Sequence, residues 1–131
     1  MRSRILFISG CLSDARRLTR MLHALPIVLD HAESVQSARA QLQQDAYDVI
    51  LTEAALPDGH WLDVLRLARE FAQEPEVIVT DPHADARFWA EALNLGAYDL
   101  LTQPFYEPEV RRILYNACSR PSHAHHAAAA V

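Results

Sequence analysis

The sequence predicts a doubly wound α/β domain in which helices cover both faces of a five-stranded parallel sheet. Short apolar runs of strand length alternate with longer stretches whose apolar residues recur at helical spacing. This alternation is typical of parallel strands joined by right-handed helical crossovers. The runs are apolar throughout, as expected for strands that are buried on both faces. The predicted strands are residues 5–8, 27–29, 49–51, 77–79 and 98–101.

Helix signals lie between and after these strands. Ser13 and Ser34 are the expected N-caps of the first two helices, because a serine oxygen can accept a hydrogen bond from a first-turn amide. A third helix follows the Pro-Asp-Gly turn behind the third strand. The fourth is expected from about residue 84 to Gly96, a typical C-terminal cap. The fifth starts near Pro108, since proline is favoured in a first helical turn.

Composition limits the class of protein. The chain has 131 residues, half of them hydrophobic, which suits one domain with a sizeable core. We expect this domain over residues 1–120 and a disordered Ala/His-rich tail over residues 121–131. A net charge of -5 argues against nucleic-acid or membrane partners. No apolar run approaches the roughly 20 residues of a membrane span, and no signal peptide is recognisable, so a cytoplasmic location is expected.

Ligands of doubly wound sheets bind beyond the carboxyl ends of the strands, so the residues there are the first candidates for a site. His60 and His83 are near this edge, but their spacing matches no metal-ligand pattern. Cys11 has no partner histidine or resolving cysteine close in sequence. We therefore predict no catalytic residues, metal or cofactor, and no enzyme activity. The residues at this edge are Ser9, Gly10, Cys11, Thr52, Glu53, Thr80, Asp81, Thr102 and Gln103.

Four segments, residues 47–59, 77–80, 95–97 and 102–105, follow one another at a characteristic mutual spacing. Through them, residues 4–118 bear a resemblance to the receiver domain of two-component response regulators. The resemblance implies a CheY-like, flavodoxin-like (βα)5 fold with strand order 2-1-3-4-5, an order that periodicity alone leaves open. It also implies a role in signal transduction by phosphorelay.

The positions that carry phosphorylation chemistry in this family are altered. Two acidic residues that hold Mg²⁺ match Ser9 and Gly10, which offer no carboxylate. The phosphorylated aspartate matches Glu53, whose extra methylene displaces the carboxyl group. The lysine that clamps the phosphoryl group matches Gln103, and all 12 basic residues of the chain are arginine. The resemblance also implies a cis peptide bond before Pro104.

The two switch positions are changed as well. The switch serine or threonine falls on Asp81, and Thr80, one residue earlier, is expected to face the other side of the strand. The switch aromatic falls on Leu100. Glu53 can be interpreted as a mimic of the phosphorylated state or as a structural remnant, although a carboxylate has less charge than a phosphoryl group.

These changes favour an atypical receiver, or pseudo-receiver, that acts through protein–protein contacts without aspartyl phosphorylation. In this family the docking face consists of the fourth helix, fifth strand and fifth helix, and there we expect Phe88, Ala92 and Leu95 to face outward. The alternative for Phe88 is a ring that is partly buried against its neighbours. The inward stripe of that helix is expected to contain Ala86, Trp89, Ala90 and Leu93. The expected partner is a sensor kinase or an output protein, and a homodimer is possible. The alternative is a receiver-like domain that senses a small molecule or a metal in the altered pocket.

Overall fold

The computed structural model describes residues 2–119, so the predicted tail over residues 121–131 lies outside the described residues. Five parallel strands form one sheet in the order β2-β1-β3-β6-β7. If only the five strands of this sheet are numbered in chain order, the order is 2-1-3-4-5, which confirms the predicted flavodoxin-like topology. The strands are β1 (Ser3–Ile8), β2 (Ile27–Ala32), β3 (Val49–Glu53), β6 (Glu76–Asp81) and β7 (Asp99–Thr102).

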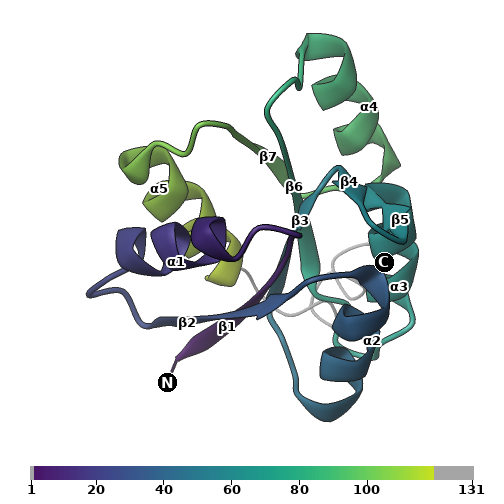
Figure 1. The fold of residues 1–131 in the computed structure, drawn as a ribbon, viewed down its shortest axis with the longest axis horizontal. Coiled ribbons are helices and arrows are strands. Elements are labelled where there is room, and N and C mark those ends of the chain that lie inside the picture. Colours follow the sequence, from purple (N-terminus) through teal and green to yellow (C-terminus); the bar gives the residue numbers. More distant parts are fainter. Residues whose placement is uncertain (1, 120–131) are drawn as a thin grey trace, which may run out of the picture.

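Five helices cover the two faces of this sheet. Helices α1 and α5 lie on one face, and α2, α3 and α4 lie on the other (Figure 1). Each face buries its own apolar cluster, one around Ile5, Phe7 and Leu114, and one around Leu6, Ile50 and Val79. The helices are α1 (Leu12–Met21), α2 (Val35–Gln44), α3 (Trp61–Arg69), α4 (Ala86–Leu95) and α5 (Glu107–Cys118).

A small antiparallel hairpin, which the sequence did not reveal, follows β3. It consists of β4 (Ala55–Leu56) and β5 (Gly59–His60). A Cβ atom added at Gly59 would lie 2.7 Å from Oδ2 of Asp63, in the first turn of α3. The hairpin therefore packs directly against the first turn of α3.

The predicted helix ends agree with the structure except at the first helix. Ser34 caps α2 by accepting from the amide of Ser37 at 3.1 Å, and Gly96 ends α4 in the left-handed conformation with φ 118°. The prediction of Ser13 as N-cap is wrong. Helix α1 already begins at Leu12, so Ser13 lies inside its first turn, and the N-cap residue is Cys11.

The predicted inward face of α4 is also wrong, because the residues that face the sheet are shifted by one position along the sequence. Ala92 is fully buried, and the half-buried ring of Phe88 packs against Trp61 with 5.7 Å between ring centroids. Trp89 and Leu93 are instead 41% and 44% exposed. The aromatic contact with α3 fixes this rotation. Among the three residues predicted to face outward, Leu95 is exposed, whereas Phe88 and Ala92 are not.

Candidate functional site

The carboxyl ends of β1, β3, β6 and β7 bring the predicted site residues to one edge of the sheet. Glu53 ends β3 and is paired in register with Thr80 of β6. Asp81 is paired with Thr102, the last residue of β7, and Gln103 follows it. Ser9 and Gly10 follow β1 directly. The topology therefore places these positions together, as the sequence predicted.

Glu53 interacts with the turn after β1. Its Oε1 atom accepts a hydrogen bond from the backbone N–H of Gly10 across 3.3 Å. Its carboxylate is partly exposed, since Glu53 is the one residue of β3 that is not fully buried. The end of β1 thus presents a hydrogen-bond donor to this carboxylate.

Ser9 is fully buried and forms a hydrogen bond near the N-terminus of α1. Its Oγ atom accepts a hydrogen bond from the amide of Cys11 at 2.9 Å, which satisfies one donor near the helix N-terminus. Its carbonyl oxygen is 2.7 Å from Nε2 of His31. Because a carbonyl oxygen only accepts, Nε2 is protonated and donates this hydrogen bond. Both polar groups of Ser9 thus have partners within the fold.

Gln103 reaches a hydroxyl group that sequence reasoning had placed elsewhere. Its Nε2 atom donates to Oγ1 of Thr80 at 3.0 Å, and that hydroxyl donates to the carbonyl of Leu101 at 2.7 Å. The sequence placed Thr80 on the other side of the strand from Asp81 and outside the site, whereas this bond makes Thr80 a partner of the site residue Gln103. Strand β6 ends at Asp81, two residues beyond its predicted end at residue 79. The Gln103–Pro104 peptide is cis, as the resemblance implies.

Leu100, which the resemblance matches to the switch aromatic, is only 2% exposed. It belongs to the apolar cluster beneath α3 and α4. It is thus a core side chain, on the face of the sheet where Trp61 and Phe88 meet.

The loop after Glu53 is held by helix N-termini. Both carboxylate oxygens of Asp58 accept backbone hydrogen bonds from the first turn of α2, at 2.8 Å from Val35 and 3.0 Å from Gln36. These donors lower the pKa of Asp58. His60 caps α3 through Nδ1, which accepts from the amide of Leu62 at 3.2 Å. This role of Asp58 was not predicted, although an Asp in a Pro-Asp-Gly turn commonly accepts backbone hydrogen bonds.

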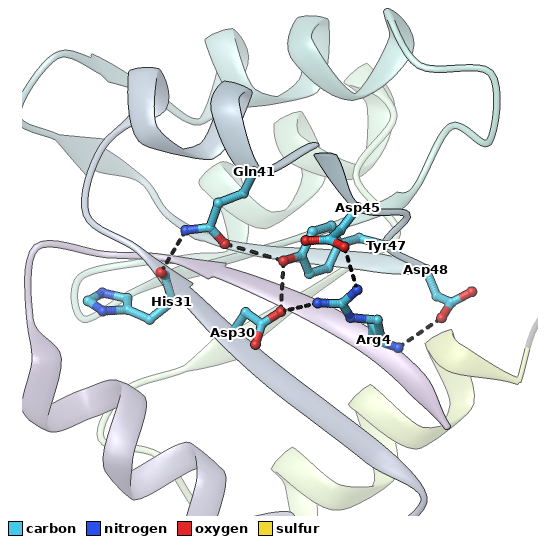
Figure 2. Close-up of polar contacts among 7 residues, drawn as sticks. All are labelled: Arg4, Asp30, His31, Gln41, Asp45, Tyr47 and Asp48. Atoms are coloured by element: carbon cyan, nitrogen blue, oxygen red, sulfur yellow. Dashed lines mark hydrogen bonds and ion pairs between the residues drawn. The ribbon is translucent and has the colours of Figure 1, made fainter. Parts of the chain in front are cut away.

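A second polar cluster lies near the amino-terminal end of β1, away from Glu53. Figure 2 shows Arg4 between Asp30 and Asp45, with nitrogen–oxygen distances of 2.7 and 3.1 Å. The buried Tyr47 donates to the same Asp30 oxygen at 2.7 Å, and the Arg4 guanidinium is 4.9 Å from the Tyr47 ring centroid. Burial and the Asp30 carboxylate raise the pKa of Tyr47. This cluster ties β1, β2 and the loop before β3 together.

Within residues 2–119, no three His, Cys, Asp or Glu side chains are grouped as metal ligands would be. None of the helices in the same range is long and apolar enough to cross a bilayer.

Comparison with known proteins gives consistent matches. The family model for the response regulator receiver domain matches residues 13–115. The transcriptional regulatory protein KdpE of Staphylococcus aureus is 31% identical over 116 residues, which are 85% of this chain and 48% of KdpE. The chain spans between 18% and 54% of the length of eight curated relatives that it matches.

Solved structures show the same fold. The receiver domain of the Francisella response regulator 1452 has a TM-score of 0.80 at 20% identity, with 91% of this chain and 98% of that domain covered. The beryllofluoride-activated NtrC4 receiver domain, solved as a dimer, has a TM-score of 0.79 at 23% identity, with 88% and 95% covered.

Proposed function

This chain belongs to the response regulator receiver family of two-component signal transduction, and we propose that it signals through protein contacts without phosphorylation at Glu53. It is then a non-catalytic, cytoplasmic binding module. Its partner is a sensor kinase or an output protein. The alternative, sensing of a small molecule or a metal in the altered pocket, stays a prediction.

The observation that carries this proposal is the contact between Gly10 and Glu53. A divalent cation such as Mg²⁺ needs oxygen ligands, and the end of β1 offers the Glu53 carboxylate an N–H donor across 3.3 Å. The Ser9 hydroxyl is buried and oriented toward the amide of Cys11. Neither position after β1 thus supplies a carboxylate that would help Glu53 to hold a cation.

The arrangement around Gln103 supports the same proposal. A lysine at this position would bring a positive charge to stabilise a transferred phosphoryl group. Gln103 brings a neutral amide, which is bonded to Oγ1 of Thr80 at 3.0 Å. The site thus lacks the cationic group as well as the acidic pair, and phosphoryl transfer depends almost entirely on such electrostatic stabilisation.

Incubation with acetyl phosphate and Mg²⁺, followed by intact-mass analysis, tests this proposal. We expect the mass of the protein to stay unchanged. The Glu53→Ala variant is the matched control, because it removes the candidate acceptor and leaves other nucleophiles in place. A phosphoryl adduct that appears on the natural chain and disappears in Glu53→Ala would falsify the proposal.

The outer face of α4 is the proposed partner-binding surface. Trp89 and Leu93 lie one turn apart and are 41% and 44% exposed, and Leu95 nearby is 44% exposed. Exposed aromatic and aliphatic side chains of this kind are frequent anchors of protein interfaces. This surface replaces the predicted one, because Phe88 and Ala92 pack inward. A second copy of the chain is one possible occupant, to be distinguished by measuring the molar mass in solution.

A further inference from the structure

A shallow groove lies between helix α1 and the edge strand β2. Its volume is about 400 Å³. Leu12, Ala15 and Leu29 give it an apolar lining, and Leu12 is 49% exposed. Arg16 and Arg20 lie along the same groove. It is on the face of the sheet opposite α4, so it is separate from the proposed partner-binding surface (Figure 1).

The charge of helix α1 contrasts with that of the whole chain. The helix contains Arg16, Arg17 and Arg20 against a single acidic residue, Asp14, whereas the chain has a net charge of -5. Within residues 2–119, the guanidinium groups of these three arginines have no ion pair or hydrogen bond. Arg4, by contrast, is held by two carboxylates. The groove thus combines exposed apolar surface with positive charges that the fold does not use.

We propose that this groove binds an acidic amphipathic helix of a partner protein. Arg16 and Arg20 are four residues apart and therefore about 6 Å apart along the helix axis. Carboxylates four residues apart on a partner helix have the same spacing, so each can pair with one arginine through charge-assisted hydrogen bonds. Apolar side chains on the same partner face then cover Leu12, Ala15 and Leu29.

The free edge of β2 favours a helix over an added strand. The carbonyl of Ala32 accepts from the amide of Ser9, so the carbonyl of the preceding residue, His31, is directed to the free edge. There it already accepts from Nε2 of Gln41 at 3.0 Å (Figure 2). A partner strand would have to break this bond, whereas a helix that lies in the groove leaves it intact.

Binding of a synthetic peptide tests the proposal directly. The probe is a helical peptide with leucine on one face and glutamate pairs four residues apart beside it, titrated into isotope-labelled protein and followed by amide chemical shifts. We expect shifts confined to α1 and β2, centred on Leu12, Thr19 and Leu29. A peptide with glutamine in place of glutamate is expected to bind with an affinity lower by about tenfold or more, because the charged contacts are lost.

Paired variants locate the binding site. Arg16→Glu with Arg20→Glu is expected to weaken peptide binding about tenfold or more, since attraction becomes repulsion. Arg87→Glu, a charge reversal on exposed α4, is the control and is expected to leave the affinity unchanged. Leu12→Ser tests the apolar contribution. Equal effects of the α1 and α4 reversals, or shifts scattered over the surface, would overturn the proposal.

Two other anionic probes separate a helix from less specific partners. Vesicles of phosphatidylglycerol and a single-stranded oligonucleotide also attract arginines. Binding of either probe that depends on Arg16 and Arg20, together with no binding of the acidic peptide, would overturn the proposal. Preference for the peptide over both probes supports it. These outcomes do not depend on whether Glu53 accepts a phosphoryl group, so the two proposals fail or stand separately.

Discussion

The side-chain amide of Gln103 donates a hydrogen bond to the hydroxyl of Thr80 across 3.0 Å, at the edge of the sheet where β6 and β7 end. Thr80 is fully buried, and its own proton goes to the carbonyl of Leu101 at 2.7 Å. The amide therefore satisfies a hydroxyl that no longer has access to water. The resemblance matches Gln103 to the family's lysine, so this bond engages a neutral amide at a position where a positive charge would be expected.

Restoring the charged groups should restore phosphorylation. The variant with Ser9→Asp, Gly10→Asp, Glu53→Asp and Gln103→Lys regains the acidic pair, the acceptor and the lysine. Position 10 accepts a side chain, because a Cβ atom there has no other atom within 4 Å. We expect a Mg²⁺-dependent phosphoryl adduct by intact-mass analysis.

The control for this restoration keeps Glu53 and contains the other three changes. It is expected to form no adduct, since the longer side chain misplaces the carboxylate. An adduct of equal yield in the control would contradict the inference that Glu53 itself blocks the chemistry.

Substitution of Gly96 should destabilise the fold, whereas the same change at Gly10 should not. Gly96 has φ 118°, and an added Cβ would lie 2.6 Å from Nη2 of Arg69. This guanidinium donates to the carbonyl of Leu95 at 3.0 Å and so caps the C-terminus of α4. We expect Gly96→Ala to lower the free energy of unfolding by roughly 1–2 kcal/mol. Urea denaturation measures it, with Gly10→Ala as the matched control.

The fold was largely predictable because apolar strand runs and helix caps are local signals. Ser34 and Gly96 illustrate this, since a serine cap and a left-handed glycine depend on the residues beside them. The rotation of α4 was not predictable in this way. Its sequence contains apolar residues on more than one side, and only the contact of Phe88 with Trp61 on another helix selects the buried side.

The candidate site was predictable in its positions but not in its hydrogen bonds. The resemblance placed Glu53 and Gln103 at one edge, since the carboxyl ends of parallel strands meet there. The bond between Gln103 and Thr80 was missed, because the resemblance assigned the switch position to Asp81. That bond depends on the pairing of β6 with β7, which a single sequence does not record.

The rotation of α4 can be tested with two neighbouring aromatic residues. Phe88→Ala removes a half-buried ring that packs on Trp61, and we expect the free energy of unfolding to fall by about 2–3 kcal/mol, somewhat less than for a fully buried ring. Trp89→Ala removes an exposed side chain, with an expected change within about 0.5 kcal/mol. Chemical denaturation of both variants gives the comparison. A larger loss in Trp89→Ala than in Phe88→Ala would refute the observed rotation.

Tyr47 should make the protein less stable at alkaline pH. Its ordinary pKa is 10.0, and burial together with the Asp30 carboxylate raises the pKa in the folded state. The folded chain thus retains a proton that the unfolded chain loses, so this contribution to stability is complete below pH 10 and falls as the pH rises further. The pH range above 10 is suited to this measurement, because the chain has no lysine that would also titrate there. Burial also raises the pKa of the Cys118 thiol to about 11, so its ionisation lowers stability in the same direction as the pH rises.

Comparison with Tyr47→Phe isolates the contribution of Tyr47, because Cys118 is common to both proteins. The variant should be less stable at pH 7 by about 1–2 kcal/mol, since Asp30 and Gln41 lose the hydroxyl donor. Its free energy of unfolding should then decline less steeply between pH 9 and about pH 11. Tyr106→Phe, at a 65% exposed position, is the control and should follow the natural chain throughout. Parallel alkaline slopes for Tyr47→Phe and the natural chain would mean that Tyr47 ionises equally in both states, contrary to its place beside Asp30.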